Sequence, residues 1–580
     1  MHSQNFHNWE FPENDREQVA EISKKLHIDP VVTHIIFNRG IKSEKSVRDF
    51  LDPKLSLIEK EFCPIGTEKA IDRIIEAIKK KENIIVFGDY DADGVTGTVV
   101  LLDALKNLGA NVEYYVPYRY TEGYGLNPEA IHKFKSDGIT LVITVDCGIS
   151  NINEITLANE LGIDVIITDH HTPPAKLPPA VAIVNPKCEH DSSSKYLAGV
   201  GVAYKFIYYL YKKFRNIDII KNKKYLELVA IGTITDVVPL LGDNRIFVKN
   251  GIEKMNRETS LGLHYLLEYI NSNEINTTTI GFGIGPRINA AGRLESASLA
   301  IDLLLSKNSK TAKDLAYELN NLNEKRKKEG ENIFLEAIKD IEQNPDILKK
   351  KVFVLSSDIW EPGVIGIVAS QLAKHYKRPV VLITTKGKIC RGSIRSFAGI
   401  NVFYTLEQCN DLLLSYGGHA EAAGFEIDKN KIETFKEMYI RILDAFLEVE
   451  DLYSVVRIDS ELEMNEITHE FYDQLKKLEP YGEGNREPIF LTRNMNAIDY
   501  NLVGKDRSHL KVLFIQGSEQ IEAIGFKMAS YLGLLDKYST FDVAYNLSTN
   551  YFNGEKTLQL KLVDIKPSET YDSLDVLSDD

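Results

Sequence analysis

Cysteine is scarce in this chain and is not arranged for cross-linking or zinc binding. The five cysteines among 580 residues are scattered and odd in number, and none has Cys-x-x-Cys spacing. This argues against a disulfide framework and structural zinc, and it suits a reducing compartment. The chain also lacks any run of eighteen apolar residues, so no membrane span is expected. Because its first twenty residues are polar and carry no secretory signal, we expect a cytoplasmic protein.

An excess of positive charge is missing as well. The net charge of −15 argues against a protein that coats nucleic acid without specificity. It leaves room for an enzyme that takes one strand into a local groove, because metal-binding carboxylates add formal negative charge. The residues after Pro567 are rich in acidic side chains, and we expect them to form a solvated, disordered tail.

The chain is too long for a single core, and its patterns change along its length. From about Asn83 to Pro186, short β-branched runs alternate with helical stretches, which predicts an α/β domain with a doubly wound parallel sheet. A long polar helix is expected from about Ala312 to Ile341. A second, smaller α/β domain follows, and after Asp451 the chain becomes β-rich.

The β-rich part is predicted to be a small OB-like barrel. Leu558, Leu560 and Leu562 alternate with more polar residues, as in a half-buried strand. Asn553-Gly554, just before them, is a typical hairpin turn.

Three carboxylates stand close together directly after the apolar run Ile84–Phe87. They are Asp89, Asp91 and Asp93, and they cannot all stay charged at the end of a buried strand unless a cation holds them. An EF-hand loop would need a glutamate at its twelfth position, where this chain has Val100. A haloacid-dehalogenase-type phosphatase would need a downstream lysine and acidic pair, and the chain offers a different set.

That set lies mainly at the ends of other strands. Asp146 follows the apolar run Leu141–Val145, and Asp169-His170-His171 follows Val165–Thr168. Asp236 ends a helical segment. Mixed carboxylate and imidazole ligands suit Mn²⁺ better than Ca²⁺, and Mg²⁺ is also possible. The number of ligands predicts two divalent ions, suited to in-line displacement at a phosphate.

These motifs resemble the four motifs of the DHH phosphoesterase superfamily. The resemblance implies that Asp91, Asp93, His170 and Asp236 are metal ligands, that Asp146 bridges the two ions, and that His171 contacts the scissile phosphate. Some members have a histidine where this chain has Phe87, and Asp89 is the candidate to supply the missing ligand. Asp169 is expected to orient His170.

Further blocks resemble the RecJ family of single-strand-specific 5′→3′ DNA exonucleases, over about residues 30 to 566. They are Val116–Leu126, Gly285–Leu294, Arg391–Ser396, Gly417–Phe425, Pro480–Asn485 and Gly504–Lys511. The resemblance implies single-stranded DNA as substrate, roles in recombination and repair, and single-strand-binding protein and a helicase as partners.

Several residues in these blocks are suited to bind a DNA strand. Arginine offers planar, bidentate donors to phosphate oxygens, and tyrosine can stack on bases. The predicted substrate-binding residues are Arg119, Tyr124, Arg287, Asn289, Arg293, Ser393, Arg395 and His419.

The resemblance thus implies a monomeric, metal-dependent 5′→3′ exonuclease that releases mononucleotides, and the chain is predicted to consist of six segments. The segments are an N-terminal helical extension (1–65), the DHH catalytic domain (66–310), a connector helix (311–345), a DHH-associated substrate-binding domain (346–447), the OB-fold domain (448–567) and the acidic tail (568–580). The alternative is a DHH phosphodiesterase for short oligonucleotides or cyclic dinucleotides. A non-catalytic scaffold is disfavoured because the acids and His170 are all present.

Overall fold

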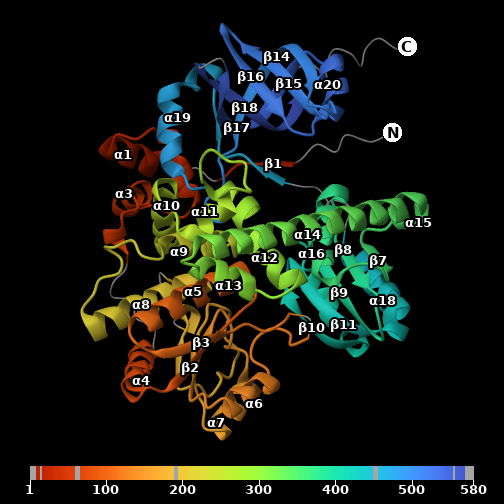
Figure 1. The fold of residues 1–580 in the computed structure, drawn as a ribbon. Helices are drawn as coiled ribbons and strands as arrows, with labels where there is room; N and C mark the ends of the chain where they lie inside the picture. The colour runs from red at the N-terminus through yellow and green to blue at the C-terminus, as the bar shows by residue number, and fades with distance from the viewer. Residues whose placement is uncertain are drawn as a thin grey trace.

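The computed structural model describes residues 8–12, 16–58, 66–119, 121–188, 194–447, 455–552 and 555–568. A first α/β body, a second α/β body and a barrel follow one another along the chain (Figure 1). The first body, Thr67–Leu305, is called the catalytic body after the prediction made for it. The predicted hairpin turn at Asn553-Gly554 and residues 569–580 of the predicted tail lie outside the described residues. Among the described helices, none combines the length and hydropathy needed to span a bilayer.

The catalytic body contains the predicted parallel sheet, with strand order β3-β2-β4-β5-β6. The strands are β2 (Asn83–Gly88), β3 (Asn111–Tyr115), β4 (Leu141–Val145), β5 (Asp164–Thr168) and β6 (Ala182–Val184). From β2 the chain first adds β3 on one side and then β4 on the other. The carboxyl ends of β2 and β4 therefore flank the topological switch point, where such sheets bind ligands.

Helices cover both faces of this sheet. Alternate strand residues such as Val86 and Ile143 share a core with α5 (Ala92–Asn107) and α8 (Gly199–Arg215). Their neighbours, including Phe87, point to the opposite face, against α6 (Pro128–Ser136) and α7 (Ile152–Glu160). Burial on both faces explains why these strands are apolar almost throughout.

More helices complete the catalytic body and lead out of it. They are α4 (Thr67–Lys80), α9 (Leu226–Thr235), α10 (Gly242–Arg257), α11 (Leu261–Leu267), the π-helical η3 (Thr279–Ile284), α12 (Gly285–Leu294) and α13 (Ser298–Leu305). The predicted connector is α14 (Ser309–Gln343), which runs across the molecule in Figure 1. Its Leu319 lies in the core of the catalytic body, whereas Ile333 and Ala337 lie in that of the second body. The connector is therefore built into both cores.

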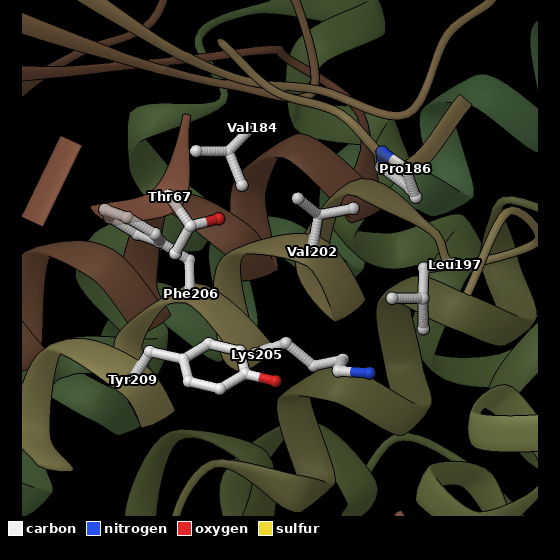
Figure 2. Close-up of a pocket in the computed structure, with 8 residues that line it drawn as sticks. All are labelled: Thr67, Val184, Pro186, Leu197, Val202, Lys205, Phe206 and Tyr209. Atoms are coloured by element: carbon white, nitrogen blue, oxygen red, sulfur yellow. The ribbon is translucent and has the colours of Figure 1, made fainter. Parts of the chain in front are cut away.

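One charged pair is buried within the catalytic body. Lys205 on α8 is 4% exposed, and its Nζ donates to Oδ2 of Asp243 at 2.8 Å and to Oγ of Ser194 at 2.9 Å. Figure 2 shows Lys205 among the residues that line a small, mainly apolar cavity, together with Thr67 and Val202. Through these two bonds Lys205 links Ser194, which precedes α8, to Asp243 in the first turn of α10.

The second body is a mixed sheet with order β10-β11-β9-β8-β7, in which only β7 and β8 are parallel. The strands are β7 (Phe353–Ser357), β8 (Val380–Thr384), β9 (Ile389–Arg395), β10 (Leu413–His419) and β11 (Ala422–Asp428), with helices α15 (Pro345–Leu348), α16 (Pro362–Tyr376), α17 (Val402–Glu407) and α18 (Ile432–Phe446). This matches the predicted smaller α/β domain.

The last body is a closed barrel, as predicted. Its strands are β14 (Phe490–Val503), β15 (His509–Gln516), β16 (Glu519–Gly525), β18 (Glu555–Pro567) and β17 (Thr540–Phe552), and β17 pairs back to β14. The short β13 (Ser460–Glu461) adds to β14, and α19 (His469–Leu475) and α20 (Leu532–Lys537) flank the barrel.

The N-terminal helices do not stand alone. The helices α1 (Arg16–Leu26), α2 (Pro30–Asn38) and α3 (Glu44–Leu51) share a single core with the barrel, and they lie beside α19 in Figure 1. In addition, β1 (Asn8–Glu10) pairs in parallel with β12 (Val455–Arg457). The N-terminal segment is thus joined to the barrel and to the strand that precedes it, which the sequence did not predict.

Candidate metal centre

The triple-aspartate run forms the turn between β2 and α5. Oδ1 of Asp91 caps α5 by accepting the N–H groups of Asp93 at 2.9 Å and Gly94 at 3.0 Å. A Cβ on Gly94 would lie 2.6 Å from Cβ of Asp89, so only glycine allows the turn to close this tightly. The tight turn brings the side chains of Asp89 and Asp91 to the same edge of the sheet.

The side chain of Asp93 reaches the start of α8. Its Oδ2 accepts the N–H of Gly199 at 2.6 Å, and its Oδ1 accepts the N–H of Val200 at 2.9 Å. Gly199 is also close to Asp146, since an added Cβ would lie 2.7 Å from the Cβ of that aspartate. Sequence reasoning missed these two donors because a backbone N–H carries no side-chain signature.

The structure brings all the predicted metal-site residues together. Nε2 of His170 lies 3.0 Å from Oδ1 of Asp146, 3.5 Å from Oδ2 of Asp236 and 3.9 Å from Oδ2 of Asp93. Three sets of side chains each have ligand atoms within 4.8 Å of one another: Asp89, Asp91 and Asp146; Asp93, His170 and Asp236; and Asp146, His170 and His171. Asp146 and His170 each belong to two of the sets, so these two residues connect the cluster.

Burial and the repulsion between neighbouring carboxylates raise the pKa values of the aspartates in this cluster. Burial and the charge of Asp91 raise the pKa of Asp93 to about 7, and burial and the charge of Asp93 raise the pKa of Asp236 to about 9. The pKa values of Asp89 and Asp146 are also raised, for the same two reasons. Burial lowers the pKa of His170 to about 3, so its imidazole is neutral.

Several of these buried atoms lack a partner among the described residues. They are Oδ1 of Asp89, Oδ1 of Asp146, Nε2 of His170 and Oδ2 of Asp236. Buried polar atoms are normally hydrogen-bonded, and buried charges are normally paired or bound to metal. The oxygen-rich set with one neutral imidazole therefore fits divalent cations.

Asp169 contacts the ring of His171, and the predicted contact with His170 is made through the backbone N–H of that residue. Its Oδ1 lies 2.8 Å from Nδ1 of His171 and accepts the backbone N–H of His170 at 2.7 Å. Burial alone would lower the pKa of His171, but the hydrogen bond and charge of Asp169 outweigh burial and raise it.

Tyr124 enters the site through its hydroxyl group. Its Oη donates to the backbone oxygen of Asp146 at 3.0 Å and lies 3.3 Å from Nδ1 of His171. The residue is still 48% exposed, so the ring remains accessible for the predicted stacking.

Asn185 is a site residue that sequence reasoning missed. It follows β6, and its Nδ2 donates to the backbone oxygen of His171 at 2.9 Å. A polar residue directly after a buried strand is the same signal that identified Asp146. Applying that signal to the strand ending at Val184 would have found it.

The predicted substrate-binding residues of the second body lie on strands β9 and β10 of one sheet, on either side of β11. Arg395 on β9 aligns with Ala422 on β11, which aligns with His419 on β10. Nη1 of Arg395 donates to Oγ of Ser393 at 3.0 Å. Burial lowers the pKa of Arg395, and the nearby charge of Arg119 lowers it further. The arginines of the two bodies therefore approach each other.

Arg119 and a pocket mark the boundary between these bodies. The guanidinium of Arg119 lies 5.0 Å from the ring centre of Tyr90 in the first motif. The pocket is lined from the catalytic body by Thr121, Glu122 and Gly123, and from the second body by Pro362, Thr384, Lys386, Ile389, Arg391 and Glu426.

The predicted residues on α12 make contacts within the protein. Oδ1 of Asn289 accepts the N–H of Ala92 at 2.8 Å, and Nη1 of Arg293 donates to the backbone oxygen of Gly363 at 3.2 Å. Arg287 is 6% exposed and donates to Asn320 and to two backbone oxygens. The structure therefore gives Arg287 a buried structural role instead of the predicted phosphate contact.

Known proteins match this chain domain by domain and along its whole length. The DHH family N-terminal domain matches residues 83–233, the DHHA1 domain residues 349–445, and the RecJ OB domain residues 458–564. The single-stranded-DNA-specific exonuclease RecJ of Bacillus subtilis is 37% identical over 568 residues, which cover 97% of this chain and 71% of the relative. The chain belongs to the RecJ family. The RecJ of Haemophilus influenzae is also 37% identical, over 94% of this chain and 98% of its own.

A RecJ structure has the same fold. The crystal structure of Thermus thermophilus RecJ in complex with Mn²⁺ has a TM-score of 0.84 and 32% identity, and the match covers 98% of this chain and 80% of that one. Its Mg²⁺ complex has a TM-score of 0.78 and 30% identity. The agreement extends over catalytic body, second body and barrel, as the sequence predicted.

Proposed function

We propose that this RecJ-family protein is a single-stranded-DNA-specific 5′→3′ exonuclease. It hydrolyses phosphodiester bonds with two divalent metal ions, for which Mn²⁺ is favoured and Mg²⁺ also suited, and it releases 5′-mononucleotides for DNA recombination and repair. The observation that carries the proposal is the convergence at the switch point of the sheet of buried ligand atoms that have no hydrogen-bond partner within the described ranges. They belong to Asp89, Asp146, His170 and Asp236.

Each side chain has a separate role in this proposal. Asp89, Asp91, Asp93, His170 and Asp236 would hold the cations, and Asp146 would be the ligand common to both. Two divalent cations supply Lewis acidity for in-line displacement at a phosphate. His171 donates its Nδ1–H to Asp169, which raises the pKa of the ring and favours its protonated form. In that form Nε2 also carries a proton and can donate to an oxygen of the scissile phosphate.

The second body recognises the 5′ end. Ser393, Arg395 and His419 hold the terminal phosphate, and Arg119 assists from the catalytic body. Tyr124 stacks on a base, and Asn289 and Arg293 lie along the path of the strand. A shared terminal phosphate explains why Arg119 and Arg395, from two different bodies, lie near each other despite their like charge.

The remaining assignments follow from the family resemblance. We assign the six predicted segments as domains, and the matched regions 83–233, 349–445 and 458–564 each fall inside one of them. The protein acts as a monomer in the cytoplasm, with single-strand-binding protein and a repair helicase as partners.

Digestion of strands labelled at either end tests the proposal. With Mn²⁺ or Mg²⁺, a 5′-labelled long strand should release labelled mononucleotide at once, whereas a 3′-labelled strand should shorten gradually and a duplex should persist. Release from the 3′ end would refute the polarity. A preference for dinucleotides over the long strand would favour the alternative, a phosphodiesterase for short oligonucleotides or cyclic dinucleotides.

A further inference from the structure

Asp236 reaches the metal centre from a short loop between α9 and α10. Asp236 caps the end of α9, and Val237 follows it with φ of +59°, a left-handed conformation that a β-branched residue rarely adopts. Val237 is also 65% exposed, so its own packing does not impose this conformation. Something outside α9 must therefore fix the loop 237–241.

The segment Pro480–Asn485, which leads into the barrel, contacts this loop directly. The N–H of Leu240 donates to the backbone oxygen of Glu483 at 2.8 Å. A Cβ on Gly482 would lie 2.6 Å from Cδ1 of Leu240, and a Cβ on Gly484 would lie 3.1 Å from Cβ of Pro239. An added Cβ would press on Leu240 at the first glycine and on Pro239 at the second, so the two glycines allow this close approach to the loop.

Hydrogen bonds from other parts of the protein fix the segment Pro480–Asn485 in place. Nε of Arg39 donates to Oδ1 of Asn485 at 2.6 Å, and Nδ2 of Asn485 donates to the backbone oxygens of Leu478 and Pro480. Arg245 is 1% exposed, and its guanidinium donates to the backbone oxygens of Phe50, Lys477, Glu479 and Pro480. These bonds tie the segment to the N-terminal helices and to α10.

The loop is also anchored on its other side. Nδ2 of Asn244 donates to the backbone oxygens of Pro239 at 3.0 Å and Tyr196 at 2.6 Å. Leu240 lies in the core of the catalytic body, whereas Leu241 packs against the core shared by the barrel and the N-terminal helices. The loop therefore lies between two cores, five residues or fewer from a predicted metal ligand.

We propose that Pro480–Asn485 is a positioning segment for the metal centre, which sets the place of the Asp236 carboxylate through loop 237–241. The inference rests on the proposed metal-binding role of Asp236. It assigns the leading segment of the barrel domain a part in building the hydrolytic site, separate from any contact with DNA.

Gly484→Ala tests this inference, with Gly517→Ala as the matched control. Both glycines have positive φ, +69° and +61°, but no atom lies within 4 Å of a Cβ on Gly517. The two variants thus share the backbone cost and differ in the contact with Pro239. Binding of Mn²⁺ to the DNA-free protein is measured from the electron paramagnetic resonance signal of the Mn²⁺ that stays free in solution. The values of kcat and KM are measured with a long single strand as substrate.

Gly484→Ala should lower the affinity for the more loosely bound Mn²⁺ by about tenfold or more. Changes of this size are found when residues that orient metal ligands are altered. Excess Mn²⁺ should restore kcat, and KM for DNA should stay unchanged, whereas Gly517→Ala should behave as the parent protein. If Gly484→Ala does not fold, Gly482→Ala decides, because its added Cβ would lie 2.6 Å from Cδ1 of Leu240 and would press on the same loop at a different residue. Parental Mn²⁺ binding in the folded variant, or an equal shift in Gly517→Ala, would overturn the inference.

Asp236→Asn, measured in parallel, separates this inference from the proposed function. If Asp236→Asn keeps full Mn²⁺-dependent activity, the assignment of the metal centre fails. If Asp236→Asn is inactive while Gly484→Ala binds Mn²⁺ normally, only the positioning role fails.

Discussion

Nε2 of His170 lies 3.0 Å from Oδ1 of Asp146, and neither atom has a hydrogen-bond partner among the described residues. Because burial lowers the pKa of His170 to about 3, its neutral ring offers a lone pair to this space. A buried carboxylate oxygen facing a lone pair is unfavourable without a shared cation.

Asp146→Asn should therefore abolish DNA hydrolysis at any Mn²⁺ concentration. The substitution preserves shape but removes the charge shared by two of the ligand sets. Asp72→Asn is the control, since that carboxylate lies on α4 and is 64% exposed. Activity and thermal unfolding should be compared, and a folded Asp146→Asn protein that degrades DNA normally would contradict the assignment.

Metal should reverse the dependence of stability on pH. Folding raises the pKa of Asp93 to about 7 and of Asp236 to about 9, from an ordinary value of 3.8. Between the ordinary pKa of 3.8 and the raised values, the folded protein binds more protons than the unfolded chain. Without metal, its free energy of unfolding therefore falls as the pH rises through this range to about 9. Between pH 7 and 9 the opposing effect of His170 is absent, because its ring is largely neutral in both states.

Thermal unfolding at pH 7, 8 and 9 checks this expectation. In chelator, Tm should decline across the series and should decline less in Asp236→Asn. Saturating Mn²⁺ should raise Tm most at pH 9, where the carboxylates are charged. A metal-free Tm that rises from pH 7 to 9 would count against the buried-carboxylate explanation.

Tyr124→Phe distinguishes the two roles of this tyrosine. The change removes the hydroxyl that contacts Asp146 and His171 but keeps the ring. We expect kcat to fall by about 10- to 100-fold, as for other partners of site residues, with KM unchanged. Tyr124→Leu should also raise KM. Tyr118→Phe is a control on a tyrosine that is 52% exposed, and an unchanged kcat in Tyr124→Phe would exclude the orienting role.

Arg395→Gln should reduce the preference for a 5′-phosphorylated strand. Loss of a charge-assisted hydrogen bond costs about 1.5–3 kcal/mol, which corresponds to a rise in KM of roughly 10- to 100-fold. A strand with a 5′-hydroxyl should be affected much less. Arg441→Gln on the exposed side of α18 serves as the control. Equal losses on both strands would show that Arg395 does not read the terminal phosphate.

Lys205→Met should destabilise the protein. It leaves the buried carboxylate of Asp243 without the ammonium group that lies 2.8 Å away, and breaking such a pair costs about 3–5 kcal/mol. The double variant Lys205→Met/Asp243→Leu removes both charges and should recover part of the loss in chemical denaturation. A double variant less stable than Lys205→Met would contradict this account.

The parts of the site that the sequence predicted share one physical origin. In a parallel sheet the carboxyl ends of the strands meet at one edge, so a polar residue after each apolar run identifies that edge. This was sufficient for Asp89, Asp146 and His170. It could not decide which of two adjacent histidines Asp169 would hold, because that depends on side-chain directions within a turn.

Other features left no local trace in the sequence. The donors to Asp93 are backbone N–H groups of Gly199 and Val200, which any residue could supply. Arg287 lies in a glycine-bounded block typical of a phosphate loop, and only the tertiary contacts show that its donors face protein oxygens. The core shared by α1–α3 and the barrel joins residues too distant in the chain for periodicity to reveal.

That shared core has a consequence for how the protein is made. The apolar side chains of α1–α3 leave the ribosome long before Phe471 and the barrel strands that complete their core. At about 5–20 residues per second, the wait is roughly 20 to 80 s. During synthesis most of the core that covers these helices is still missing, so a nascent chain halted before β12 would present them to chaperones and proteases.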